Sequence, residues 1–189
     1  MKIARLTTAA LAGLACAFAA SAALSQSYPV SDDFTDFEEW IKSEEALGGS
    51  VSTGFAGGDV YTTFSVDRYN VGNESVFDFG ISHIVYEPGF SDSYKGSFGK
   101  NIADQVSVTI DGTKFPVTSA AMSPSEEGGI YVSLIFSDAS DQDQMWEENC
   151  RIVTALMNAR EFRVSFEPDH DGFRFTGKGS ARALADLHC

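Results

Sequence analysis

The sequence predicts an α+β, β-rich fold: an antiparallel sandwich or partly closed barrel with one packed helix and a short C-terminal helix. Three observations support this prediction. Runs rich in β-branched and aromatic residues recur between turn residues over most of the chain. An Asp-Gly pair separates two alternating runs, which favours a tight hairpin. Residues 145–159 keep a long apolar face at helical spacing.

The first residues have the layout of a secretory signal peptide, which we predict over residues 1–25. Lys2 and Arg5 precede an apolar run, and small residues follow before the chain becomes polar. Cleavage is expected after residue 25 or three residues earlier. A lipid-attachment motif at Cys16 would need a leucine at position 13, where the chain has Gly13. We therefore expect a bacterial protein that is periplasmic or secreted.

Residues 26–189 are expected to form a single β-rich domain, because their length is close to the usual domain size. They contain no apolar run near the ~20 residues that cross a bilayer as a helix, so no transmembrane segment is predicted. The full chain carries 27 acidic and 13 basic residues, a formal net charge of −14. Such a surface repels nucleic acid and anionic membranes, and it either serves solubility alone or also binds cations or a basic partner.

Cys150 and Cys189 are the cysteines that remain after removal of the signal peptide, and we predict that they form a disulfide. An even cysteine count in an exported protein favours pairing. Closing this loop of about 40 residues would stabilise the fold by about 4 kcal/mol, by restricting the unfolded chain. The alternative is a reactive thiol at Cys189 with His188 as its base, but a chain terminus is a poor place to exclude water.

The segment after the signal peptide predicts a helix. It begins after Ser31 or Asp32, has acidic residues in its first turns and ends at Gly48. Its apolar residues at positions 34, 37, 40 and 41 have helical spacing, which indicates a stripe that faces the core. The functional alternative is an acidic, aromatic helix that binds a partner.

Two strands and an aromatic loop are expected next. Residues 58–66 and 75–86 are rich in β-branched and aromatic side chains, and we predict that they pair as antiparallel neighbours. Residues 87–101 form a loop by composition. Phe90, Tyr94 and Phe98 in this loop either cover the edge of the core or face a ligand.

Residues 106–117 give the clearest local prediction, a hairpin whose turn is Asp111-Gly112, because the favoured two-residue turn needs positive φ at both positions. Pro116 has no N–H to donate, so the second arm is predicted to be an edge strand. Residues 130–136 are almost continuously apolar and are expected to form a central strand.

The C-terminal part of the chain is predicted to contain a helix, a hairpin and a short helix. The acidic loop 138–144 either begins the helix or gathers a calcium ion, although its spacing does not match a calcium loop. The helix covers residues 145–159. Residues 161–166 and 173–176 form the hairpin. Ser180 is expected to cap the last helix, in which Ala181, Leu184 and Leu187 share one face.

A glycine-rich run, residues 172–180, superficially matches a phosphate-binding loop. Gly172, Gly177 and Lys178 have the required offsets, but Gly179 occupies the position where a hydroxyl would hold magnesium. We interpret the run as a turn between strand and helix, and we predict no cofactor.

The three histidines do not form a metal or catalytic motif in the sequence. His83 lies in a strand, His170 in a turn and His188 beside the last cysteine, and a zinc site needs more ligands at closer spacing. Residues 169–171 (Asp-His-Asp) either bind a metal adventitiously or form a hydrated turn. No Gly-x-Ser-x-Gly nucleophile motif is present, and we assign no catalytic, cofactor-binding or metal-binding residue.

The second half of the chain, about residues 106–189, resembles the invasion-associated locus B family of exported bacterial proteins. The likeness lies in the hairpin VSVTIDGTKFPV, the helix-to-strand segment ALMNAREFRVSF and the terminal segment FRFTGKGSARALADLHC. The resemblance implies a β-rich periplasmic or surface-associated domain, linked in some members to host-cell invasion. This chain lacks the cysteine pairs that such proteins often carry in their first half, and its acidic N-terminal segment differs.

Two functional hypotheses follow. The first is a non-enzymatic periplasmic or envelope-associated protein that binds an unidentified protein or envelope component; it predicts an exposed aromatic or apolar patch. The second is a small exported hydrolase or metal-assisted enzyme. It requires His83 or His170 within hydrogen-bond reach of a carboxylate and a nucleophile in a concave site.

Overall fold

The computed structural model describes residues 40–43, 50–57, 60–71, 74–125, 128–166 and 172–189. The predicted signal peptide, residues 1–25, lies outside these residues, as does the part of the predicted N-terminal helix before residue 40. No helix in the described part of the chain is long and apolar enough to span a membrane.

The larger sheet has six antiparallel strands in the order β1-β2-β3-β4-β8-β7. Their bounds are β1 Ile41–Ser43, β2 Ser50–Gly57, β3 Val60–Val71, β4 Glu74–Val85, β7 Ser119–Pro124 and β8 Ile130–Ile135. The smaller sheet has the order β10-β9-β5-β6. Its strands are β5 Ser107–Ile110, β6 Thr113–Phe115, β9 Glu161–Ser165 and β10 Phe173–Thr176.

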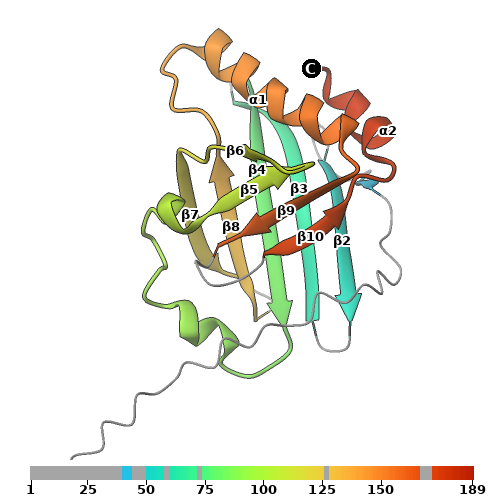
Figure 1. Ribbon diagram of the computed structural model, residues 1–189. Helices are drawn as coiled ribbons and strands as arrows, with labels where there is room; N and C mark the ends of the chain where they lie inside the picture. Colours follow the sequence, from blue (N-terminus) through green and yellow to red (C-terminus); the bar gives the residue numbers. More distant parts are fainter. Residues whose placement is uncertain (1–39, 44–49, 58–59, 72–73, 126–127, 167–171) are drawn as a thin grey trace, which may run out of the picture.

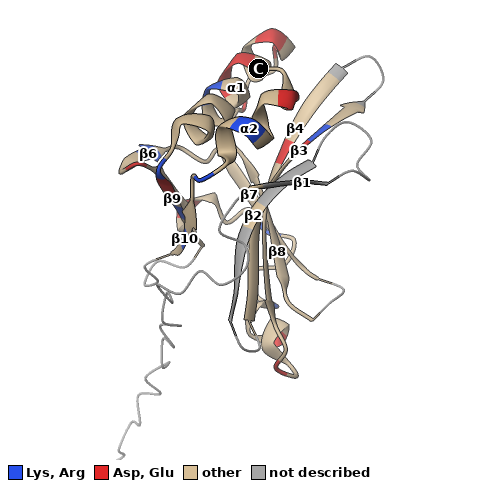
Figure 2. Ribbon diagram, turned by 90° about the vertical axis from the view of Figure 1, so that its right-hand side faces the viewer, with Lys and Arg blue, Asp and Glu red and all other residues tan. Residues whose placement is uncertain are grey.

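Helix α1 (Gln142–Asn158) and the short helix α2 (Ser180–Leu184) belong to the same layer as the smaller sheet. Figure 1 shows both helices at one end of the smaller sheet. Seen edge-on in Figure 2, these elements lie on one side of the six-stranded sheet, and no labelled element lies on its other side. The predicted β-rich α+β sandwich is therefore confirmed, and the two sheets do not close into a barrel.

Aromatic residues fill the core between the two layers. Phe64 of β3 packs against Phe162 of β9 and Phe175 of β10, with ring centroids 4.9 and 5.9 Å apart. Phe162 and Phe175 stack at 4.9 Å. All three are about 1% exposed, so each contributes roughly 2–3 kcal/mol of hydrophobic stabilisation before entropy is counted. This packing fixes which face of β3 and β4 is covered.

The hairpin prediction for residues 106–117 is confirmed. Asp111 and Gly112 both have positive φ, 46° and 78°, as the two-residue turn requires. β6 is an edge strand, as the position of Pro116 predicted. The Asp111 carboxylate also accepts hydrogen bonds from the backbone N–H groups of Arg160 and Glu161 at 3.0 Å. These bonds, chiefly the one from Glu161, lower the pKa of Asp111 and join the turn to the start of β9.

The other central predictions are also confirmed. β3 and β4 pair as antiparallel neighbours, and β8 lies between β4 and β7 inside the sheet. α1 begins three residues earlier than predicted, because Asp141 caps it: its carboxylate accepts from the N–H of Gln144 at 3.0 Å. β9 and β10 form the predicted hairpin.

Three local predictions are wrong. The N-terminal helix does not extend to Gly48, because Ile41–Ser43 pair with β2 as a strand. Trp40 is buried as predicted, but backbone and indole hydrogen bonds to Lys178 and Thr176 hold it.

Ser180 does not cap α2; Gly179 does, at φ 82°, and the Ser180 hydroxyl donates to the carbonyl of Gly177 at 2.7 Å. Ala181 is exposed, whereas Ala183 is buried beside Leu184 and Leu187.

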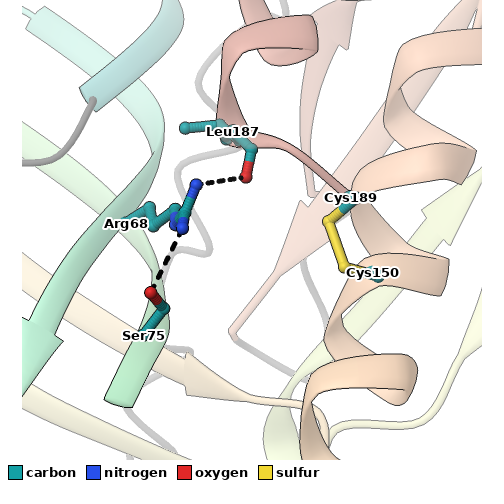
Figure 3. Close-up of a disulfide and its surroundings, with 5 residues drawn as sticks. All are labelled: Arg68, Ser75, Cys150, Leu187 and Cys189. Atoms are coloured by element: carbon teal, nitrogen blue, oxygen red, sulfur yellow. Dashed lines mark hydrogen bonds between the residues drawn. A yellow bond between two sulfur atoms is a disulfide. The ribbon is translucent and has the colours of Figure 1, made fainter. Parts of the chain in front are cut away.

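The C-terminus is tied to the body of the protein at two points (Figure 3). Cys150 of α1 and Cys189 form the predicted disulfide, with Cα atoms 5.3 Å apart. The Arg68 guanidinium, from β3, donates to the carbonyl of Leu187 at 3.1 Å and lies 5.3 Å from the centre of the Trp146 ring. The side chain of Leu187 is 1% exposed. The disulfide therefore reinforces a segment that also packs into the core.

Replacing both disulfide cysteines, Cys150→Ser/Cys189→Ser, should lower the free energy of unfolding by about 2–4 kcal/mol, because the unfolded chain gains the freedom of an open loop. Urea unfolding monitored by circular dichroism measures this loss. Reduction of the wild-type protein is the matched control and should produce a similar decrease. An unchanged unfolding midpoint in both would show that the disulfide contributes nothing.

Gly177 lies where two backbones cross. A Cβ at this position would overlap the carbonyl oxygen of Ala159, and the N–H of Gly177 donates to the carbonyl of Arg160 at 2.8 Å. Gly177→Ala should therefore destabilise the fold by about 2 kcal/mol or more, since backbone has to move. Gly96→Ala is the control, because a Cβ there meets nothing within 4 Å. Equal unfolding midpoints for the two variants would contradict this close crossing.

Candidate functional site

The glycine-rich run near the C-terminus forms the strand-to-helix turn that we predicted. Gly177 accommodates the backbone crossing, and Gly179 adopts positive φ at the start of α2. The N–H of Lys178 donates to the Thr176 hydroxyl at 3.1 Å, and the Lys178 carbonyl accepts from the N–H of Trp40. These backbone groups serve local structure.

The predicted aromatic loop covers the edge of the core. Phe90, Tyr94 and Phe98 are partly buried and pack against the core cluster. Phe90 and Tyr94 lie in a short 3₁₀ helix, Phe90–Tyr94, with ring centroids 5.4 Å apart. The Tyr94 ring lies 6.3 Å from Phe166 of the second layer. The loop thus closes the end of the sandwich, which supports the structural alternative over the ligand-facing one.

Two of the three histidines can be placed. His83, on β4, is 2% exposed, and its Nδ1 lies 2.8 Å from the hydroxyl of Thr62, which is 0% exposed. Phe173 and Phe90 surround the ring at centroid distances of 4.7 and 5.4 Å. His188 is exposed, and His170 lies outside the described residues.

A histidine bonded to a hydroxyl is the pair that activates a nucleophile in many hydrolases. Here both His83 and Thr62 are buried under phenylalanine rings, so a substrate cannot approach them. The pair satisfies two polar groups inside the sandwich.

The acidic loop before α1 places Asp141 as the helix cap. Residues 169–171 lie outside the described ranges. Within those ranges no group of three or more His, Cys, Asp or Glu side chains is arranged to hold a metal ion.

The structure reveals a candidate site that we did not predict, on the side of the six-stranded sheet that faces away from the second layer. Strand alternation points the even-numbered residues of β3 and the odd-numbered residues of β4 inward, where Phe64, Val66, Phe79 and Ile81 are buried. Their neighbours point outward. We call this surface the outer face and define it by six residues: Asp67, Tyr69, Asp78, Tyr131, Ser133 and Ile135.

Two large side chains of the outer face are well exposed, Tyr69 at 43% and Ile135 at 49%. They lie on β3 and β8, on either side of β4 in the sheet. Ile84, near the other end of β4, also faces outward by alternation but is 3% exposed. The open part of the surface is therefore the half that contains Tyr69 and Ile135.

A hydrogen-bond network holds the centre of the outer face. The Asp78 carboxylate accepts from the Tyr131 hydroxyl at 3.0 Å and from the Ser133 hydroxyl at 2.9 Å. Tyr131 reaches Asp78 because its ring lies across Gly80, where any Cβ would overlap it. Asp78 is thus fixed by two donors from β8, and Gly80 supplies the space.

Burial, and secondarily the negative charge of Asp78, raises the pKa of Tyr131 well above its ordinary value of 10.0. Tyr131 therefore keeps its proton at neutral pH and acts as a donor, so it is unsuited to act as a base or a nucleophile there. The negative charge of Asp67 raises the pKa of Tyr131 slightly further.

Asp67 and Asp78 stand directly opposite each other as register partners of β3 and β4. Side chains in such a pair have Cβ atoms about 4.5–5.5 Å apart, and like charges at this spacing are destabilising. An alternating pattern around Asp67 and Tyr69 signals one outward face, but the register that brings Asp78 alongside is not visible in the sequence.

Comparisons of the chain with protein-family models, with curated proteins and with solved structures found no match. The interpretation of the outer face therefore rests on its geometry and chemistry.

Replacing Tyr131 with phenylalanine removes one donor to Asp78 and keeps the ring over Gly80. Tyr131→Phe should lower the free energy of unfolding at pH 7 by about 1–2 kcal/mol, since the lost bond reaches a charged acceptor. Thermal unfolding measures the change. Tyr69→Phe is the control and should be nearly neutral, because Tyr69 is exposed.

The same variant should alter the alkaline titration of the protein. Because folding raises the pKa of Tyr131, its contribution to stability is complete below pH 10 and is lost as the pH rises above that value. In an alkaline titration followed by ultraviolet absorbance, the wild-type protein should show one tyrosine that ionises at a higher pH than the others. Tyr131→Phe should lack this tyrosine. Identical titration curves would contradict the Tyr131–Asp78 contact.

Proposed function

We propose that this chain is a non-enzymatic periplasmic or cell-envelope-associated protein, a binding module that holds an envelope component or another protein on its outer face. The observation that carries the proposal is the asymmetry of the six-stranded sheet. One face is buried by the second layer, and the other presents exposed Tyr69 and Ile135 around a fixed carboxylate.

The composition of the outer face fits this role. Tyrosine is enriched at protein interfaces because it combines a large apolar ring with a polar tip at low entropic cost. A rigid sheet also presents its side chains without further ordering, which reduces the cost of binding. The network of Tyr131, Ser133 and Asp78 adds a polar group whose position is already set.

Export is supported by the N-terminal sequence pattern and by the Cys150–Cys189 disulfide, since disulfides persist in oxidising compartments. We further propose that the chain is related to the invasion-associated locus B proteins, through the hairpin and the C-terminal pattern of its second half. The alternative of an exported hydrolase depends on a histidine within reach of substrate. His83 is buried, so it does not support the hydrolase alternative.

Site-specific photocrosslinking in intact cells tests this proposal. A photoreactive residue at Tyr69 or Ile135 should yield discrete crosslinked products, recovered with the osmotic-shock or envelope fraction. Thr113 is the matched control, because it is exposed on β6 in the other layer. Products of the same size and yield from all three positions, or none from Tyr69 and Ile135, would reject the outer face as the binding surface.

A further inference from the structure

The outer face places two carboxylates side by side. Asp67 and Asp78 are directly opposed on adjacent strands. The hydrogen bonds from Tyr131 and Ser133 go to Asp78 alone. Among the residues whose side chains the structure describes, none donates a hydrogen bond to the Asp67 carboxylate or forms an ion pair with it. A cation bound between the two carboxylates would relieve the repulsion.

The basic residue next in sequence does not neutralise the pair. Strand alternation directs Arg68 to the opposite face of the sheet, where it bonds to the carbonyl of Leu187 and lies over Trp146. The outward positions of β7 and β8 are occupied by small, aromatic or aliphatic residues: Ser119, Ala121, Ser123, Tyr131, Ser133 and Ile135. The described outer face is therefore anionic.

The two carboxylates retain room for donors. A carboxylate offers about four lone-pair sites, and Asp78 uses one on each oxygen. No donor to the Asp67 carboxylate comes from the side chains that the structure describes. A single metal ion suits this geometry less well, because the described residues provide no third acidic or imidazole ligand.

A guanidinium group matches the remaining features. It presents several N–H donors in a plane, binds carboxylates bidentately and stacks on aromatic rings, which an ammonium group does less well. Tyr69 supplies an exposed ring two residues from Asp67 on the same face.

Building on the proposed function, we propose that the partner is a cationic polypeptide segment whose arginine side chain binds between Asp67 and Asp78, beside Tyr69. The exposed Ile135 then contacts the apolar part of that segment.

The experiment titrates tetra-arginine peptide into the ¹⁵N-labelled mature protein at 0.15 M salt, where general attraction to an acidic protein is screened. Amide shifts should concentrate on residues 65–69, 76–80 and 131–135.

Asp67→Asn/Asp78→Asn should weaken binding by at least about fivefold, and tetra-lysine should bind more weakly than tetra-arginine. Asp138→Asn/Asp143→Asn removes two exposed charges near the start of α1, and binding should stay within about twofold.

Asp67→Asn alone provides a second variant if the double variant does not fold, because the hydrogen bonds from Tyr131 and Ser133 go to Asp78 and stay in place. If the control variant Asp138→Asn/Asp143→Asn loses as much peptide affinity as Asp67→Asn/Asp78→Asn, binding depends only on net charge. That result would overturn the proposal. If calcium chloride shifts the same amide signals to saturation and displaces tetra-arginine, the two carboxylates form a metal site. That result would also overturn the proposal. If the peptide does not bind but Tyr69 and Ile135 still form crosslinks in cells, the cationic partner is rejected. The proposal that the outer face binds a partner is then retained.

Discussion

The structure depends on the burial of one face of the six-stranded sheet by a layer built from the second half of the chain. Phe64 of β3 packs against Phe162 and Phe175, and Arg68 bonds to Leu187, so β3 contacts the second layer in its middle and near its C-terminal end. The disulfide at Cys189 secures the last part of that layer. Because this layer covers only the inner side of the sheet, it also determines which side chains form the outer face.

Most predictions based on local chemistry were confirmed, although Gly179 rather than the predicted Ser180 caps α2. The turn at Asp111 and Gly112 needs positive φ at two consecutive positions, which few sequences supply. The apolar face of α1 and the pairing of Cys150 with Cys189 were predicted from similarly strong signals. Each depends on a few residues that are close in sequence, or on a property of the whole chain.

Predictions failed where distant contacts decide the structure. Trp40 has helical spacing with Phe37 and Ile41, but it bonds to Thr176 and Lys178, more than 130 positions away, and the adjoining residues pair with β2. Residues 50–57 were not predicted as a strand, because two glycines interrupt the alternation of Val51, Thr53 and Phe55, yet they form β2 against β3. The outer face was missed for the same reason. Asp67 and Asp78 become neighbours only through the register of the β3–β4 hairpin.

The central claim is that the outer face is open to solvent in the folded protein. A soluble gadolinium chelate measures this directly, because it enhances the relaxation of exposed side-chain methyl signals. Ile135 and Leu134 are adjacent in β8 but differ in exposure, at 49% and 1%, and Ala121 and Ala120 provide a second pair on β7. Our account predicts strong relaxation enhancement at Ile135 and Ala121, with Leu134 and Ala120 protected. Equal protection of Ile135 and Leu134 would show that the outer face is covered, and would contradict the proposal that it binds a partner.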